Sequence, residues 1–122
     1  MDLGWQVIYG TCPSKSNCNR VAVMNGKPMM YKSSTLRKFE DDFLMQCGKY
    51  RGMKIASRFE FYCKVYYPSN SHDIDNSLKV QLDCLQYANA IKNDNLCIKV
   101  VAEKFIDKKV PRIEFKIVTI DD

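Results

Sequence analysis

The sequence lacks any long apolar segment. Among its 122 residues, no uninterrupted apolar run approaches the roughly 20 residues that a transmembrane helix requires. Residues 1–5 show no basic stretch followed by an apolar one, so no signal peptide is expected. Internal repeats, linkers and low-complexity segments are absent as well. The expected organisation is a single domain over residues 1–122, which would gain binding surface most readily by pairing with a second copy.

Histidine, glycine-rich loops and paired cysteine motifs are scarce or absent. His72 is the only histidine, which excludes every Ser-His-Asp or Cys-His arrangement that does not use it. The five glycines are scattered, so no GxGxxG phosphate loop is present. The six cysteines form no CxxC or CxxH pattern, and a zinc site at Cys12 and Cys18 has the wrong spacing and partners. Reduced thiols in a cytoplasm are therefore expected.

What the sequence does contain is an excess of positive charge. It has 19 Lys and Arg residues against 14 Asp and Glu, a formal net charge of +5. With 46% hydrophobic and 27% charged residues, its composition is that of a folded globular protein. The basic residues are spread along the chain. This distribution permits phosphate contacts with a polyanion, but it serves solubility equally well, so charge alone leaves both interpretations open.

Hydrophobic spacing predicts an α+β fold. Residues 58–67 alternate between apolar and polar, which predicts a strand with one buried face. Apolar residues at helical spacing predict one helix that begins near residues 33–35 and a second helix over about residues 75–88. Asn-Gly at 25–26 predicts a hairpin. Further strands are expected at 6–9, 21–24, 28–31, 96–105 and 113–120. Together these elements predict a small mixed sheet with two main helices packed on one face.

An acidic group marks the start of the second helix. Asp73 and Asp75 are two residues apart in an extended entry, so their carboxylates can face one point. Two such carboxylates repel each other unless a cation or proton lies between them, and Mg²⁺ prefers carboxylate oxygens. Lys79 shares a helical face with Asp75 and can contact a phosphate. Asp83 lies roughly 12 Å from Asp75 along the helix and is too far to bind the same ion.

Structural roles compete with this interpretation. An aspartate before a helix is commonly an N-cap, which fits Asp73 or Asp75. Asp75 and Lys79 can form a simple surface pair, and Asp94 can be a turn residue. The spacing is not that of an EF-hand calcium loop. Tyr67 can pack at the end of its strand or wedge against DNA bases.

The order of these residues resembles a known family. Asp73-Ile74-Asp75-Asn76-Ser77-Leu78-Lys79, followed by Asp83 and Asn93-Asp94, resembles the RusA-type Holliday junction resolvases, which are endodeoxyribonucleases of bacteria and their prophages. The loop Pro13-Ser14-Lys15-Ser16-Asn17 resembles the Pro-Ser-x-Asn region of that family. The resemblance covers nearly the whole chain.

The resemblance implies a site and an activity. Asp73, Asp75 and Asp94 match the metal-binding aspartates of the family, Lys79 matches its catalytic lysine, and Asn76 is expected in support. The implied enzyme is a homodimer with an α+β fold that uses Mg²⁺, with Mn²⁺ as a substitute, to nick two strands of a four-way DNA junction in recombination and repair. It is expected in the cytoplasm, encoded by a bacterium or a phage. Residues expected to contact DNA are Lys15, His72 and Tyr67.

Two departures from the family pattern affect these expectations. Residues 70–72 replace a run that is often rich in arginine, which removes positive charge beside the site. The acidic pair is Asn93-Asp94 in place of Asp-Asp, and the second member is taken as the essential one. Two alternatives to junction resolution stay open: a protein of prophage origin that binds branched DNA without cutting it, and a nuclease for other branched DNA.

Overall fold

Four strands form a mixed sheet in a computed structural model that describes residues 1–13, 19–24 and 26–120. β4 (Phe59–Tyr67) lies inside the sheet, with β6 (Arg112–Thr119) antiparallel on one side and β5 (Cys97–Ile106) parallel on the other. β1 (Gln6–Tyr9) pairs antiparallel with β6 and completes the order β1-β6-β4-β5. β5 and β1 are therefore the two edges.

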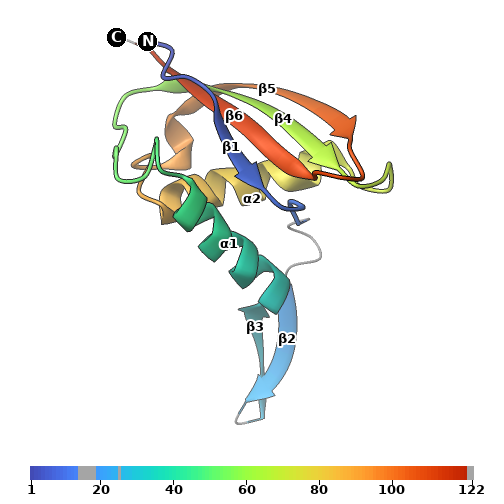
Figure 1. Ribbon diagram of the computed structural model, residues 1–122. Coiled ribbons are helices and arrows are strands. Elements are labelled where there is room, and N and C mark those ends of the chain that lie inside the picture. Colours follow the sequence, from blue (N-terminus) through green and yellow to red (C-terminus); the bar gives the residue numbers. More distant parts are fainter. Residues whose placement is uncertain (14–18, 25, 121–122) are drawn as a thin grey trace.

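Two helices pack on the same face of this sheet (Figure 1). α1 (Ser34–Gln46) begins where the sequence predicts, and the Ser33 hydroxyl caps it by accepting a hydrogen bond from the Leu36 N–H at 3.2 Å. α2 (Ile74–Tyr87) connects the parallel strands β4 and β5, so it is the crossover helix of a β-α-β unit. This connection places the start of α2 directly after the end of β4.

The core lies between the sheet and the helices. Every second residue of β4 is buried, from Phe59 to Tyr67, which confirms the alternation in the sequence. Phe115 of β6 lies at the centre, with ring centroids 5.7 Å from Phe43 and 5.3 Å from Tyr50. Aromatic groups at these distances attract one another in addition to the apolar surface they bury. This core holds β4, and hence the beginning of α2, in a fixed place.

The described cysteines are structural. Cys12, Cys47, Cys63, Cys84 and Cys97 are free, and the first four are buried. Burial raises the pKa of the Cys47 thiol to about 11 and that of Cys63 to about 12. Such thiols remain protonated and act as small apolar side chains.

A hairpin stands apart from the main sheet. β2 (Asn19–Met24) and β3 (Lys27–Lys32) pair only with each other and project from the body of the molecule beside the start of α1 (Figure 1). The expected hairpin is confirmed, although Asn25 of its turn lies outside the described residues. Pro28 lies in a strand that pairs on one side only, as its missing N–H requires.

Most expected elements are found within one or two residues of their predicted bounds. The exception is η2 (Asp94–Leu96), a single 3-10 turn that precedes β5 and was not predicted as a helix. The structure thus has the expected α+β form, with two helices and a four-stranded sheet. Among the described residues, no helix has the length and apolar character needed to cross a bilayer.

Candidate active site

The start of α2 is fixed by buried side chains and not by the aspartate that precedes it. Asp73 occupies the N-cap position with extended backbone, yet its side chain makes no capping hydrogen bond. The Ser77 hydroxyl instead donates to the Ile74 carbonyl at 2.8 Å, and the Gln81 amide donates to the Ser77 hydroxyl at 3.3 Å. Ser77 and Gln81 are fully buried. The carboxylate of Asp73 is therefore not used to stabilise the helix.

Two carboxylates at this helix start are exposed. Asp73 and Asp75 both lie at the surface, and neither has a hydrogen bond or ion pair with another described residue. The alternative in which Asp75 pairs with Lys79 is not what the structure shows, because Lys79 contacts other carboxylates. Asp73 and Asp75 thus offer their oxygens to solvent or to a ligand.

Lys79 lies between two aspartates. Its ammonium donates to Asp94 Oδ2 at 2.8 Å and lies 3.3 Å from Asp83 Oδ1. The hydrogen bond to Asp94, and after it the one to Asp83, raises the pKa of Lys79 above its ordinary value. Because the lysine side chain is 55% exposed, this pair is solvated and adds little stability. Its importance is that it fixes the ammonium of Lys79 beside Asp94, about one turn of α2 after Asp75.

Two further side chains hold the turn that carries Asp94 beside Lys79. The Gln86 side-chain oxygen accepts a hydrogen bond from the Asp94 N–H at 2.8 Å, which ties η2 to the last turn of α2. The Asn93 side chain caps η2 by accepting a hydrogen bond from the Asn95 N–H at 2.9 Å. Asparagine at position 93 therefore has a structural role that an aspartate could also perform. The chain after α2 turns back along the helix, so that Asp94 contacts Lys79.

The loop before α2 is held by an aromatic stack. The rings of Tyr67 and His72 are 4.5 Å apart and nearly parallel, and the His72 carbonyl accepts a hydrogen bond from the Lys104 ammonium at 2.9 Å. Tyr67 is 1% exposed, so the expectation that its ring contacts DNA is wrong and its packing role is the correct one. His72 is half-buried, with Nδ1 enclosed and unpaired among the described residues.

The donor chemistry suits a hard divalent cation, since Mg²⁺ prefers carboxylate oxygens such as those of Asp73 and Asp75. Within residues 1–13, 19–24 and 26–120, however, no three His, Cys, Asp or Glu side chains lie together closely enough to hold a metal ion. The third predicted ligand, Asp94, has its carboxylate on Lys79. The set of three aspartate ligands therefore stays a prediction.

Comparison with known families identifies the family of the chain. A family model described as Endodeoxyribonuclease RusA matches residues 12–118. The chain belongs to the RusA endodeoxyribonuclease family. No curated protein gives a significant match. RusA membership identifies the chain as a nuclease and implies Holliday junction resolvase activity, and RusA-type nucleases generally depend on a divalent metal.

Two residues next to the RusA motif were not predicted as parts of the site. Asp83 was set aside because it lies too far along α2 to share an ion with Asp75, yet it contacts Lys79. The spacing of four residues between Lys79 and Asp83 was the signal for this contact. Gln86 carried no such signal, because its partner Asp94 lies beyond the end of α2. Of the other predicted residues, Lys15 and the side chain of Asn76 lie outside what the structure describes.

Proposed function

We propose that this RusA-family chain is a magnesium-dependent endodeoxyribonuclease that resolves four-way DNA junctions by paired symmetric nicks. The observation that supports the proposal is the Lys79 ammonium, held 2.8 Å from Asp94, on the helix that also carries two accessible carboxylates. A lysine on the same helix as accessible carboxylates suits phosphodiester hydrolysis, because the phosphate brings negative charge that the carboxylates would otherwise repel.

Asp73, Asp75 and Asp94 would hold the divalent ion. When bound, that ion supplies Lewis acidity for a water nucleophile and for the leaving 3′ oxygen. Lys79 binds a non-bridging oxygen of the scissile phosphate and offsets the charge that grows there during attack. Water adds to phosphorus, the bond to the 3′ oxygen breaks, and the products carry a 5′ phosphate and a 3′ hydroxyl.

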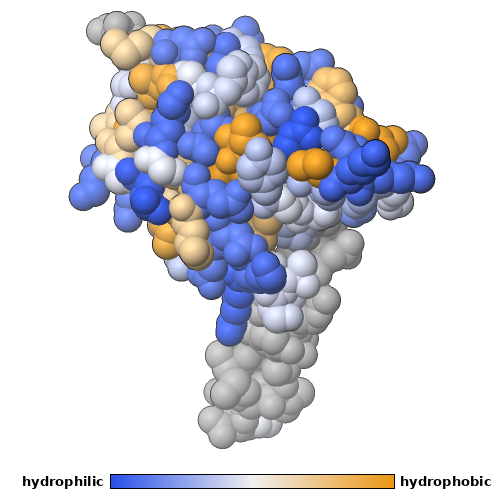
Figure 2. Space-filling model, in the orientation of Figure 1, coloured by the Kyte–Doolittle hydropathy of each residue, from blue (hydrophilic) through white to orange (hydrophobic). Residues whose placement is uncertain are grey.

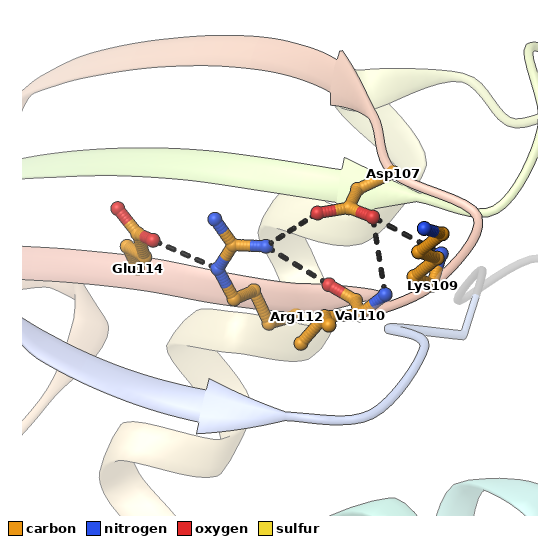
Figure 3. Close-up of polar contacts among 5 residues, drawn as sticks. All are labelled: Asp107, Lys109, Val110, Arg112 and Glu114. Carbon is orange, nitrogen blue, oxygen red and sulfur yellow. Dashed lines mark hydrogen bonds and ion pairs between the residues drawn. The ribbon is translucent and has the colours of Figure 1, made fainter.

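The turn between β5 and β6 supplies positive charge for binding DNA beside the proposed site. The Asp107 N–H donates to the Tyr67 carbonyl at 2.8 Å, so the turn between β5 and β6 lies against the end of β4. The Asp107 carboxylate accepts hydrogen bonds from the N–H groups of Lys109 and Val110 and contacts the Arg112 guanidinium at 3.0 Å (Figure 3). These bonds, the one from Val110 first, lower the pKa of Asp107.

This turn compensates for the missing arginine-rich run before Asp73. Lys108 and Lys109 are exposed on it, and Lys104 reaches the backbone of His72 in the loop that precedes α2. The proposed DNA surface therefore combines the start of α2 with the turn between β5 and β6. Contacts of this kind position a phosphate backbone without reading its sequence.

One assay tests the proposal. A labelled four-way junction is incubated with the protein with and without Mg²⁺, beside a flap and a plain duplex of the same sequence. The expected result is a pair of symmetric nicks in the junction that require the cation. A junction that is bound but left intact in both Mg²⁺ and Mn²⁺ would instead identify a DNA-binding protein, and preferred cutting of the flap would identify a nuclease for other branched DNA.

A further inference from the structure

Tyr67, the last residue of β4, is buried beside the start of α2. Burial raises the pKa of its hydroxyl to about 12, and the negative charge of Asp73 adds to this rise. The hydroxyl is therefore neutral and able to donate a hydrogen bond. Tyr67 thus lies close to the first of the two exposed carboxylates, although its own ring is out of reach of DNA.

The ring of Tyr67 holds the residue that precedes Asp73. It stacks on the His72 ring with 4.5 Å between the centroids and 6° between the planes. The His72 carbonyl also accepts a hydrogen bond from the Lys104 ammonium of β5 at 2.9 Å. Both the side chain and the backbone of His72 are therefore held, which gives the chain a fixed point directly before the acidic segment.

The hydroxyl of Tyr67 holds the residue two positions after Asp75, because it shares a hydrogen bond with the Ser77 hydroxyl. Ser77 has a single hydroxyl hydrogen and donates it to the Ile74 carbonyl at 2.8 Å, so Tyr67 is the donor in this pair. The Gln81 amide donates to the same Ser77 oxygen at 3.3 Å. Ser77 is thereby fully hydrogen-bonded, and it gives the chain a second fixed point after the acidic segment.

The two carboxylates between these points depend on the backbone for their direction. Asp73 makes no capping hydrogen bond, and both aspartates are exposed. Figure 2 shows hydrophilic surface at the right of the molecule, where Figure 1 places the loop between β4 and α2. The groups offered to a ligand here are therefore polar and at the surface, whereas the side chain that holds their backbone lies in the core.

We propose that Tyr67 is a positioning residue for the carboxylates of Asp73 and Asp75. Its ring fixes the chain before them through His72, and its hydroxyl fixes the chain after them through Ser77. A divalent cation such as Mg²⁺ demands nearly ideal octahedral placement of its oxygen ligands, so a loosened carboxylate lowers its affinity. The use of the two aspartates as ligands rests on the proposed function, whereas the hold on both flanks follows from the contacts of Tyr67.

The two contacts of Tyr67 can be removed separately. Tyr67→Phe keeps the ring and its stack but removes the hydrogen bond to Ser77. His72→Ala removes the stack and keeps the hydroxyl of Tyr67. His72→Phe restores an aromatic ring and loses an Nδ1 atom that has no hydrogen-bond partner among the described residues, so it serves as the rescue variant.

Tyr50→Phe is a matched control. Tyr50 is as buried as Tyr67, and its hydroxyl donates to the Gly4 carbonyl and accepts from the Ile117 N–H at 3.1 Å. Its removal therefore costs at least as many buried hydrogen bonds as Tyr67→Phe, in a part of the core next to β6. A loss of affinity that came only from lower stability would appear in this control as well.

Binding of Mn²⁺ without DNA tests the proposal. Electron paramagnetic resonance measures the free ion, and urea unfolding measures the stability of each variant. We expect Tyr67→Phe and His72→Ala each to weaken Mn²⁺ binding by roughly tenfold or more, as loss of groups that orient metal ligands does. His72→Phe and Tyr50→Phe should bind Mn²⁺ like the native chain. Native affinity in the first two variants, or an equal loss in Tyr50→Phe, would overturn the proposal.

A second measurement separates this proposal from the proposed function. Nitrogen-15 relaxation of the ion-free protein reports backbone motion of residues 72–77. Its amplitude should rise in Tyr67→Phe and His72→Ala but not in Tyr50→Phe. If the native chain binds no Mn²⁺ while these amplitudes rise, the proposed function fails and the positioning by Tyr67 stands. A segment that stays equally rigid in every variant refutes the positioning, whether or not the chain cuts junctions.

Discussion

The ammonium of Lys79 and the carboxylate of Asp94 meet at 2.8 Å although 15 residues separate them in the chain. This contact joins the middle of α2 to the 3-10 turn that follows it, and so it links two separate parts of the RusA motif. Its effect on the protonation of Lys79 can be measured directly.

The pKa of Lys79 should depend on Asp94 more than on Asp83. Asp94→Asn is expected to lower the pKa of Lys79 toward its ordinary value of 10.5 by more than Asp83→Asn does, because the hydrogen bond to Asp94 is the largest cause of the shift. Nuclear magnetic resonance titration of the lysine side-chain signals measures both variants. An equal or reversed order would contradict the geometry.

The direction of this shift also sets a pH dependence. The folded-state pKa of Lys79 is raised, so any stability from the pair is fully present below pH 10.5 and is lost as the pH rises through the folded-state pKa. Lys79 is therefore protonated at neutral pH and acts as a hydrogen-bond donor to phosphate, not as a general base.

Asp75→Asn should separate binding from cutting. The amide keeps the size of the side chain but removes the negative charge, so we expect cutting of the junction to fall below detection while junction binding in a gel shift is retained. Asp42→Asn is a matched control, because Asp42 forms an exposed pair with Lys38 on α1, far along the chain from the site. An Asp75→Asn variant that still nicks junctions would show that the assignment is wrong.

Gln86→Met should remove the hydrogen bond that holds the backbone N–H of Asp94. The substitution leaves the Asp94 N–H without its acceptor, which should cost about 1–2 kcal/mol of stability and slow the reaction. Gln86→Glu retains an acceptor oxygen and serves as the comparison. Hydrogen exchange of the Asp94 amide reports the effect directly: we expect protection to be lost in Gln86→Met and kept in Gln86→Glu. Unchanged protection in both variants would refute this role for Gln86.

The double variant Lys108→Ala/Lys109→Ala should weaken binding to DNA of any sequence. Loss of two phosphate contacts is expected to reduce the salt dependence of binding by about 1 in logarithmic slope per lysine. Fluorescence anisotropy over a range of salt concentrations measures this slope. Cutting at saturating protein should be little changed, since neither lysine lies on α2. Lys54→Ala/Lys92→Ala, which removes two exposed lysines elsewhere, should leave the slope as it is.

Much of the fold followed from the sequence because the signals were local. The alternation of residues 59–67 predicted β4 and its buried face, and three leucines at helical spacing predicted α2. The same alternation placed Tyr67 on the buried face, so the burial of its ring could have been predicted, and the expectation that it contacts DNA conflicted with that pattern.

The contacts that assemble the site were not local. Lys79 meets Asp94 only because β5 runs parallel to β4 and brings the chain back beside α2, and no property of residues 79–94 alone requires that pairing. Gln86 was not predicted for the same reason, since its importance depends on where η2 lies. Spacing could thus identify the acidic residues, whereas their partners depended on the packed fold.

The position of β6 has a consequence for how the enzyme is made. β6 is the last of the described strands along the chain, yet it lies between β1 and β4 and is the only described strand that holds β1 in the sheet. While the ribosome is still synthesising the chain, β1 has no partner and the Phe115 position of the core is empty. We therefore expect the nuclease to mature only after translation has passed residue 119, which would keep a growing chain from cutting DNA.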